Sequence, residues 1–468
     1  MPLVLGVDSS TQSTKVEVRD ADSGRLVSSG AAPHPATTPP KSEQDPRSWW
    51  EALLGATARA GAPAVDALAV AGQQHGLVLL DGRGAVLRPA KLWNDTESAP
   101  DASWLCNQLP GGADDWAAAV GSVPVAAFTI TKLSWVHRNE PDVFARIRRV
   151  GLPHDYLNFR LTGEWVTDRG DASGTGYWSP ASESWRLDLL EIVDREVNWA
   201  RAVPRVLSPA ETVAARDSPA IVAPGTGDNM AAALGIGLQP GRVAVSIGTS
   251  GTVFTVHDSP TADPTGAVAG FASACGRYLP LVCTLNATKV TDSIARVLGV
   301  DHAAFDALAL DAEPGAAGLT LLPYFDGERT PDRPRASGSL FGLRSDVSAA
   351  NLARAAFEGV VCGLLDGLDA LADAGVDTGS DLALVGGGAR SLAYRRVLAD
   401  LAQRPVIVPA GDEHVAAGAC VQAAGALHGR TPGEVCAAWG LGGGDVFEPT
   451  LSATRAAEVR AAYAAARG

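Results

Sequence analysis

The sequence predicts an α/β protein built from two related domains, and three observations support this prediction. Short β-branched runs that end in glycine or polar turns alternate with helical segments along most of the 468 residues. A stretch near the start of the chain reappears about half a chain length later. The composition, with 46% hydrophobic and 19% charged residues, is that of a folded protein with sizeable cores.

The repeated stretch is a predicted β-hairpin with a tight polar turn. Residues 7–20 read VDSSTQSTKVEVRD and residues 245–258 read VSIGTSGTVFTVHD. Aligned without gaps they match at several positions, among them Thr11 with Thr249, an offset of 238 residues. Small residues let a backbone approach a ligand, and successive N–H groups and hydroxyls form an anion-binding concavity. Either turn alone is compatible with an ordinary Ser/Thr-rich hairpin, but together they favour phosphate binding.

The other predicted elements fit the same α/β pattern. A Pro-rich loop over 32–40 precedes a strand, polar turn and second strand over 65–80. A helix over 351–374 is apolar on nearly every face and should be buried. The strand in 381–391 runs into a triple glycine and a helix, and the strand in 404–410 runs into a helix of small residues. A glycine turn at such a junction is typical of close approach to a flat ligand or phosphate, although the P-loop pattern is absent.

Charge and cysteine usage exclude several classes of protein. A net charge of -14 argues against non-specific binding to nucleic acid or membranes. The six cysteines form no C-x-x-C pair and the eight histidines show no zinc-ligand spacing, so we expect reduced thiols. Asp8 falls too early for a signal-peptide core, and no apolar run approaches the ~18 residues of a membrane span. We therefore expect a soluble, cytoplasmic protein.

The segment GTGDNMAAALGIG, residues 225–237, sets an acidic residue and an amide between glycines and small residues. Asp228 can be a helix cap, because aspartate accepts hydrogen bonds from free backbone N–H groups. It can also be a catalytic carboxylate held at a rigid helix start. Asp8 ends the first predicted strand beside the first polar turn, where a carboxylate repels phosphate unless a cation such as Mg²⁺ lies between them.

Ten segments along the chain carry a family resemblance. They are SEQDPRSWWEAL (42–53), AVAGQQHGLVLLD (69–81), LRPAKLWND (87–95), LPHDYLNFRLTGE (152–164), DASGTGYW (171–178), GTGDNMAAALGIG (225–237), VSIGTSG (245–251), LPYFDGERTP (322–331), GSLFGLRSDVSAANLARAAFEG (338–359) and LVGGGARS (384–391). In this order they resemble the FGGY carbohydrate kinases, most closely the members that phosphorylate D-xylulose. A single short segment is weak evidence, but ten in the family's order are specific.

The resemblance implies an actin-like ATPase (ribonuclease H-like) fold, with two similar α/β domains around a central cleft and a mixed five-stranded sheet in each. We expect a sugar-binding domain that carries the catalytic aspartate over 1–239 and an ATP-binding domain over 240–468. The implied reaction is phosphorylation of D-xylulose to D-xylulose 5-phosphate by ATP with Mg²⁺. The resemblance leaves a homodimer open and implies neither a nucleic-acid nor a membrane partner.

The resemblance also implies roles for individual residues. Asp228 would be the general base, and Asp8 and Asp228 would be catalytic and would hold the metal. The residues implied for the sugar are Gln74, His75, Trp93, Asp228 and Asn229, and those implied for ATP are Ser10, Thr11, Lys15, Gly248, Thr249, Gly387, Gly388 and Ala389.

Some of these assignments have structural alternatives. Lys15 is also compatible with a solvated strand-edge lysine, and Trp93 with core packing, while Asp95 could reach sugar hydroxyls. Glu328 and Arg329 could close over the site or form an internal ion pair. The family commonly has methionine at the position of Gln74, so the amide adds a hydrogen-bonding group to the predicted sugar pocket.

Other functions compete with a D-xylulose kinase. A kinase of the same family for ribulose, xylitol or another polyol is the nearest alternative. A non-kinase actin-like ATPase would keep both polar turns, but it would not need QQHG and GDN together. A sugar sensor with an inactive site would not need both Asp8 and Asp228.

Overall fold

The computed structural model describes residues 1–61 and 64–468, which form two compact units. Unit 1 comprises Met1–Gly237, Asp258–Leu279 and Glu413–Leu441. Unit 2 comprises Leu238–His257, Pro280–Asp412 and Gly442–Gly468. The predicted division of the chain at residue 239 lies near the first crossing, and two later segments return to unit 1.

The large sheet of unit 1 is mixed and follows the order β13-β14-β5-β1-β2-β3, with β15 also paired to β5. The first hairpin is antiparallel, as predicted, whereas β1 and β5 are parallel. The strands of this sheet are β1 (Leu3–Ser9), β2 (Ser13–Asp20), β3 (Leu26–Pro33), β5 (Ala67–Gly72), β13 (Val213–Ala214), β14 (Ile221–Val222) and β15 (Thr226–Gly227). Four shorter pairs are β4 (Glu43–Gln44) with β7 (Ala90–Lys91), β6 (Val78–Leu80) with β8 (Arg149–Gly151), β9 (Val166–Asp168) with β12 (Arg205–Leu207), and β10 (Trp178–Ser179) with β11 (Ser184–Trp185).

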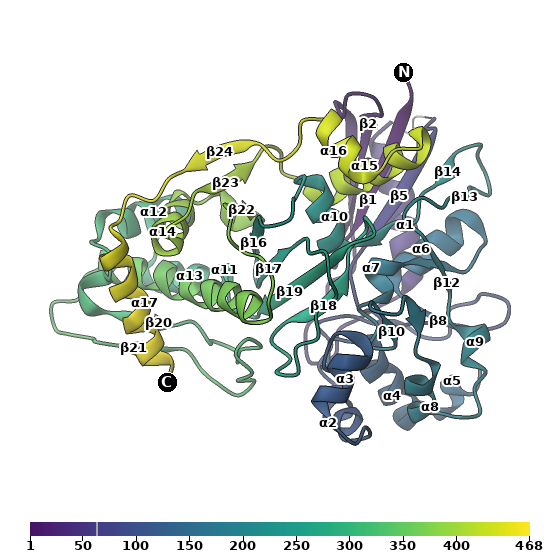
Figure 1. Ribbon diagram of the computed structural model, residues 1–468, viewed down its shortest axis with the longest axis horizontal. Helices are drawn as coiled ribbons and strands as arrows, with labels where there is room; N and C mark the ends of the chain where they lie inside the picture. Colours follow the sequence, from purple (N-terminus) through teal and green to yellow (C-terminus); the bar gives the residue numbers. More distant parts are fainter. Residues whose placement is uncertain (62–63) are drawn as a thin grey trace. The chain divides into compact units, whose positions relative to one another are not determined.

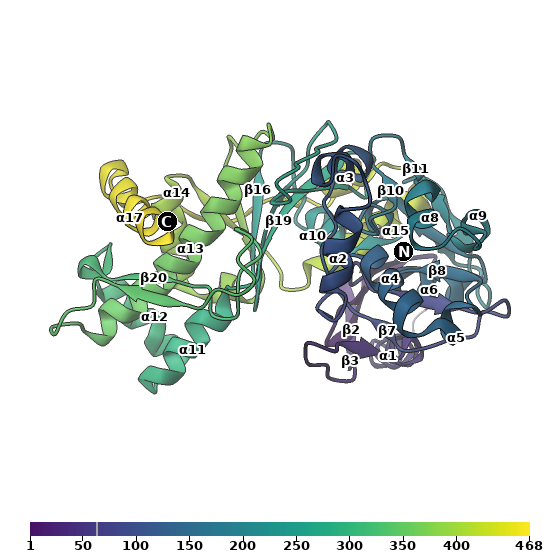
Figure 2. The ribbon, with the colours of Figure 1, turned by 90° about the horizontal axis from the view of Figure 1, so that it is seen from below.

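Helices cover this sheet and build a second hydrophobic cluster beside it. Helix α1 lies along β2 and β3 (Figure 2). Its Trp49 is fully buried in the core of the sheet. The second cluster gathers around Trp116, Leu133 and Trp199 from three other helices. The helices of unit 1 are α1 (Pro46–Arg59), α2 (Ala99–Cys106), α3 (Ala113–Val120), α4 (Thr129–Asn139), α5 (Pro141–Phe144), α6 (Pro153–Thr162), α7 (Arg169–Ala172), α8 (Leu187–Val193), α9 (Trp199–Ala202), α10 (Asp228–Gly235), α15 (His414–His428) and α16 (Pro432–Ala438).

The small residues of α15 allow an unusually close approach to its neighbours. This helix packs on β1, β5 and α10 (Figure 1). A Cβ atom at Gly418 would lie 1.8 Å from the Ala231 carbonyl oxygen, and one at Gly235 would lie 1.9 Å from that of His414. Any larger residue at these two positions would force α10, which begins at Asp228, away from α15.

The second large sheet follows the order β18-β19-β17-β16-β22-β23-β24. Its strands are β16 (Val243–Ile247), β17 (Gly251–Thr255), β18 (Ala269–Ala272), β19 (Tyr278–Thr284), β22 (Leu382–Val385), β23 (Val406–Pro409) and β24 (Gly444–Phe447), and a separate pair is β20 (Thr320–Leu322) with β21 (Ser339–Phe341). The helices of unit 2 are α11 (Thr288–Leu298), α12 (His302–Asp311), η1 (Ala316–Gly318), α13 (Ala349–Asp373), η2 (Gly387–Arg390), α14 (Leu392–Ala402) and α17 (Ala453–Arg467). Helix α13 is buried along most of its length, as its all-round apolar pattern predicts.

The half-length echo in the sequence corresponds to a repeated sheet core. The paths β3-β2-β1-β5-β14 and β19-β17-β16-β22-β23 share the same order, with two antiparallel pairings followed by two parallel ones. Each sheet has seven strands among the described residues, so the expected total of five was wrong. The additions are short or lie at sheet edges: β13 and β15 in one sheet, and β18 and β24 in the other.

All six cysteines lie within the described residues and are free thiols, as expected. In the same part of the chain, none of the helices has both the length and the apolar composition needed to cross a bilayer.

Candidate active site

The predicted catalytic residues follow three strands that end at one edge of the unit 1 sheet. Strand β1 runs parallel to β5, with Asp8 opposite Ala71. Strand β15 also runs parallel to β5, with Thr226 opposite the same Ala71. Because the carboxyl ends of parallel strands meet at one edge, Asp8, the GQQHG turn (72–76) and Asp228 emerge side by side.

Asp228 is the first residue of α10, and the cap position before it is occupied by Gly227, which has no side chain to cap the helix. The carboxylate instead accepts hydrogen bonds from Asn229, at 2.8 Å from the backbone N and 3.0 Å from Nδ2. Burial and the nearby negative charge of Asp8 raise the pKa of Asp228 to about 7. A carboxyl with such a pKa can accept a proton near neutral pH, which an ordinary aspartate does poorly.

Asp8 is buried at the end of β1, and desolvation raises its pKa to about 6. The Ser10 hydroxyl donates a hydrogen bond to this carboxylate, so the serine at a frequent glycine position adds a contact rather than only keeping the turn small. Lys15 Nζ lies 2.9 and 2.7 Å from the two carboxylate oxygens of Glu413. Lys15 is therefore not an isolated, solvated lysine. In this conformation its ammonium group is held by Glu413 and not free for a phosphate.

Gln74, His75 and Asn229 lie next to this carboxylate pair. Asn229 Nδ2 donates to Gln74 Oε1 at 2.9 Å, which links the GQQHG turn to the residue that bonds Asp228. His75 has a φ of 67°, a left-handed conformation that is uncommon for residues with a Cβ. Its Nδ1 is 2.8 Å from the Gly174 carbonyl oxygen, which can only accept, so Nδ1 carries a proton and donates this hydrogen bond. Such strain at a buried polar residue is typical of a functional site.

Trp93 is tied to the first polar turn. Its indole Nε1 donates to Thr11 Oγ1 at 2.9 Å, and that hydroxyl donates to Gln73 Oε1 at 3.1 Å. The side chain of Trp93 is only partly buried, so one part of it remains available to a ligand. Gln73 was not among the residues predicted from the sequence, although it adjoins Gln74 in the same motif.

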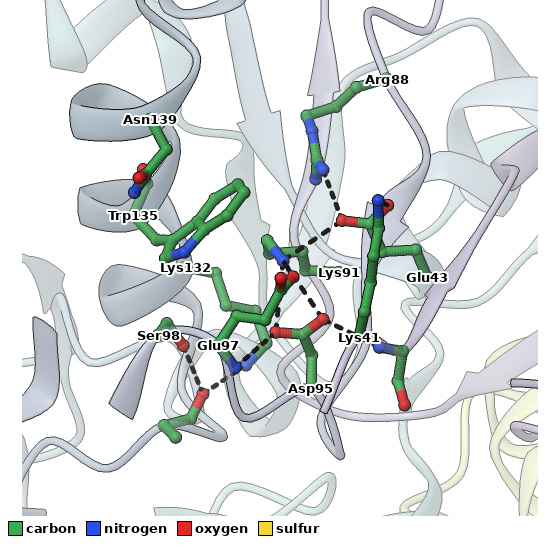
Figure 3. Close-up of polar contacts among 12 residues, drawn as sticks. Lys41, Glu43, Arg88, Lys91, Asp95, Glu97, Ser98, Lys132, Trp135 and Asn139 are labelled. Carbon is green, nitrogen blue, oxygen red and sulfur yellow. Dashed lines mark hydrogen bonds and ion pairs between the residues drawn. The ribbon is translucent and has the colours of Figure 1, made fainter. Parts of the chain in front are cut away.

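Two residues that flank Trp93 in the sequence, Lys91 and Asp95, belong to a buried cluster of one ammonium group and several carboxylates (Figure 3). Lys91 is fully buried, with Nζ 3.2 Å from Glu43, 3.2 Å from Asp95 and 2.5 Å from Glu97. The same ammonium lies 3.8 Å from the ring centroid of Trp135. The three carboxylates are close enough together to hold a metal ion, but the lysine ammonium already lies among them.

Asp95 belongs to this cluster rather than to an open sugar pocket. Its side chain is fully buried and also accepts the backbone N–H groups of Ser42 at 2.9 Å and Glu97 at 3.1 Å. The expectation that Asp95 reaches sugar hydroxyls is therefore wrong in this structure, because the carboxylate is already saturated by protein donors.

The residues expected to bind ATP in unit 2 gather at the ends of the parallel strands β16 and β22. The carbonyls of Gly248 and Thr249 accept the N–H groups of Thr288 and Ala287 at the start of α11, at 2.9 and 3.1 Å. A Cβ atom at Gly388 would lie 2.4 Å from Ile247 Cγ2, whereas one at Gly387 would meet nothing within 4 Å.

Two further glycine-turn residues complete this strand-end site. Ala389 is buried at 7% exposure in the same turn. Gly386 was not selected from the sequence, yet its φ of 84° requires a glycine where β22 enters η2.

Glu328 and Arg329 do not form the ion pair considered from the sequence. Glu328 instead accepts backbone N–H groups of Leu285 at 2.6 Å and Arg329 at 2.8 Å, and the Asn286 side-chain amide at 2.8 Å. Glu328 therefore fixes the backbone between β19 and α11.

Comparison with known proteins places the chain in a family. Residues 3–235 match the N-terminal domain and residues 243–427 the C-terminal domain of the FGGY family of carbohydrate kinases. The chain is 49% identical over 457 residues to a xylulose kinase of Streptomyces rubiginosus, covering 96% of this chain and 92% of that protein.

Solved structures agree with this match. The xylulose kinase of Bifidobacterium adolescentis superposes with a TM-score of 0.88 at 41% identity, covering 100% of this chain and 99% of the other. The glycerol kinase of Plasmodium falciparum, at 18% identity and a TM-score of 0.90 over 100% of this chain and 98% of the other, shares the fold. The predicted fold class, two α/β halves with mixed sheets in an actin-like ATPase fold, is confirmed. The chain belongs to the FGGY family of carbohydrate kinases.

Proposed function

We propose that this carbohydrate kinase transfers the γ-phosphoryl group of ATP to D-xylulose and forms D-xylulose 5-phosphate. The observation that carries the proposal is the meeting of Asp8, the GQQHG turn and Asp228 at one sheet edge. The match to xylulose kinases over nearly the whole chain supports the choice of sugar.

Asp228 is the proposed general base. Phosphoryl transfer has a loose transition state, so the protein mainly positions the reactants and offsets charge. The raised pKa of Asp228, caused by burial and then by Asp8, suits acceptance of the proton from the sugar's 5-hydroxyl. The hydrogen bonds from Asn229 to the carboxylate fix the direction in which it points.

The sugar-binding residues are proposed to be Gln74, His75, Trp93, Asp228 and Asn229. Polyol recognition needs donors and acceptors in fixed positions, and a neutral imidazole and two amides supply both. The indole of Trp93 offers an apolar face, and its bond to Thr11 fixes its orientation.

We propose Asp8 and Asp228 as the residues that would hold Mg²⁺. The Asp8 charge raises the pKa of Asp228, and the two carboxylates, with the Ser10 hydroxyl beside Asp8, offer the hard oxygen donors that this cation prefers. The ion would offset phosphate charge when bound. Ser10, Thr11 and Lys15 are the proposed phosphate contacts in unit 1, and Gly248, Thr249, Gly387, Gly388 and Ala389 are the proposed ATP contacts in unit 2.

We keep residue 239 as the proposed boundary between a sugar-binding and an ATP-binding domain. The matched family segments, 3–235 and 243–427, support this division.

Gln74 favours one second candidate, a kinase for another ketopentose or a polyol. Its side-chain amide nitrogen is buried and makes no hydrogen bond to any of the described residues, so it is available to donate to a hydroxyl of a sugar other than D-xylulose. The test is ADP release in a coupled assay with D-xylulose, D-ribulose, L-ribulose and xylitol. D-Xylulose should give the highest kcat/KM, and Asp228→Asn should remove the activity. Sugar-independent ATP hydrolysis would refute the proposal, and preference for another substrate would support the second candidate.

A further inference from the structure

The turn that leads into Asp228 forms hydrogen bonds with buried side chains from three separate elements, α6, α15 and β9. His154 on α6 has Nε2 2.8 Å from the Pro224 carbonyl oxygen. Gln422 on α15 donates to the Gly225 carbonyl at 3.0 Å. The Thr226 hydroxyl donates to Asp168 at 2.8 Å. Residues 224–226 therefore have little freedom, and two of the residues that bond them, His154 and Asp168, are ionisable.

Both ring nitrogens of His154 face hydrogen-bond acceptors. Nδ1 lies 3.1 Å from Asp155 Oδ1, and the Pro224 carbonyl opposite Nε2 can only accept. Asn158 Nδ2 lies 2.9 Å from Nε2, but it also lies 3.1 Å from the Pro224 oxygen and can donate there. A neutral ring with its lone pair on Nε2 would oppose that carbonyl, so the geometry requires an N–H on each nitrogen.

The surrounding carboxyl groups support a positive charge at this position. Burial, the largest single effect, lowers the pKa of His154, but the hydrogen bond and charge of Asp155, the charge of Asp168 and the Pro224 carbonyl together outweigh it and leave the pKa above its usual value. Asp171 Oδ2 lies 3.9 Å from Nδ1, and neither carboxylate oxygen of this buried residue accepts a hydrogen bond. Burial, followed by the charges of Asp155, Asp168 and Asp228, raises the pKa of Asp171 well above its ordinary value. The raised pKa of Asp171 and its lack of hydrogen-bond donors among the described residues favour its neutral form, beside a His154–Asp155 pair whose charges compensate each other.

Close packing leaves the imidazole no alternative position. A Cβ atom at Gly225 would lie 2.3 Å from His154 Nε2, and one at Gly72 would lie 2.9 Å from His154 Cβ. Gly72 begins the GQQHG turn and Gly225 begins the GTGDN segment. The imidazole ring therefore packs against the GTGDN segment, while the Cβ and backbone of His154 pack against the start of the GQQHG turn.

We propose that His154 is a permanently protonated imidazolium that positions the Asp228 turn by donating to the Pro224 carbonyl while it neutralises Asp155. It is a positioning residue, since it contacts the backbone that carries Asp228 and not the reacting atoms. The catalytic part of this inference rests on the proposed function, whereas the charge of His154 does not.

The charge can be measured on the intact chain labelled with ¹⁵N-histidine, using His154→Gln to assign the signals. Both nitrogens of His154 should give imidazolium shifts throughout about pH 6 to 9, whereas an ordinary exposed histidine loses its proton in this range. The groups that face the ring are Asp155, Asp168 and Asp171, with the Tyr177 hydroxyl near Asp155 and Asp171. A neutral ring, or a ring bound to metal through Nδ1, would overturn the proposal.

Kinetics test the positioning role. His154→Gln keeps a donor but removes the charge, and it should lower kcat by about 10- to 100-fold, the range expected when a charge-assisted hydrogen bond is lost. The KM for ATP should stay unchanged, because the hydrogen-bond partners of the His154 ring are Asp155, Asn158 and Pro224, none of which is proposed to bind ATP. His154→Lys restores a buried cation with several donors and should recover most of kcat. Equal loss in both variants, with equal loss of Tm, would reduce His154 to a packing residue.

A third variant separates the neutral acid from a metal ligand. Asp171→Asn replaces a protonated carboxyl by a group of the same shape and should leave kcat and Tm nearly unchanged. His154, Asp155 and Asp171 are close enough together to hold an ion. Loss of kcat in Asp171→Asn, restored by an added divalent metal, would refute the imidazolium and favour a metal site instead.

Discussion

Replacing the proposed base should stabilise the protein while it removes activity. The pKa of Asp228 rises from an ordinary 3.8 to about 7 in the folded chain, so the folded state binds more protons than the unfolded state between these values. Stability therefore falls as pH rises through this window, and the full penalty is present above pH 7. A difference of about 3 pKa units corresponds to about 4 kcal/mol, which partial solvent access of the side chain reduces to about 2–3 kcal/mol. An asparagine side chain cannot ionise, so Asp228→Asn should recover this energy at pH 8 and little of it at pH 4.

The assay is urea unfolding of wild type and Asp228→Asn at pH 4 and pH 8, with a chelator to remove divalent ions. The matched control is Asp95→Asn, since Asp95 is also buried but accepts hydrogen bonds from Lys91 and two backbone N–H groups. Removing that charge leaves the Lys91 ammonium short of a partner and should destabilise the protein by about 1–3 kcal/mol. If Asp228→Asn were no more stable than wild type at pH 8, or gained equally at both pH values, the raised pKa would be wrong.

Three further predictions address the neighbouring residues. Gln74→Met should keep kcat for D-xylulose but raise the KM for this sugar by about 5- to 10-fold, because Asn229 loses the Gln74 Oε1 acceptor. Steady-state kinetics on the sugar panel test this, and an unchanged KM for D-xylulose would contradict it. Lys15→Met should raise the KM for ATP about 10-fold. Glu413→Gln should change Tm little, because the half-exposed Lys15–Glu413 pair contributes under about 1 kcal/mol to stability, and a large loss of Tm in Glu413→Gln would contradict this. Gly388→Ala should lower the free energy of unfolding by about 1–3 kcal/mol through overpacking, and so lower Tm, whereas Gly387→Ala should keep Tm and weaken ATP binding; calorimetry of both variants separates the two effects.

The sequence identified the local elements that depend on short-range patterns. Both hairpins appear where the alternation and polar turns predicted them, with three residues between Ser9 and Ser13 and three between Ile247 and Gly251. The placement of Asp8 and Asp228 also followed from the sequence, since each comes directly after a predicted strand or turn. The common sheet edge that brings them together follows from parallel pairing with β5, which the sequence pattern does not specify.

Residues whose role depends on distant partners were missed or misassigned. Asp95 had a plausible sugar-binding chemistry, but Lys91 and the Ser42 backbone occupy its carboxylate. Glu413 reaches Lys15 across 398 residues of sequence, so no local pattern could reveal the pair. Gly386 was less conspicuous than its two glycine neighbours, although its positive φ is the conformation that requires glycine.

Charge compensation separates the supporting acidic residues of unit 1 from the proposed reacting ones. Asp95 is buried with a cation or backbone donors against each oxygen, so its charge is balanced by the protein alone. Asp8 and Asp228 are paired mainly with hydroxyl, amide and backbone groups, and their pKa values rise to about 6 and about 7. Lys15, the cation near Asp8, shares its charge with Glu413, which itself raises the pKa of Asp8. Because uncompensated buried charge costs stability, these two carboxylates would reach their lowest energy only when a cation or a proton from outside the fold joins them. The need for an external cation or proton links the uncompensated charge of Asp8 and Asp228 to the phosphoryl transfer proposed to occur at this sheet edge.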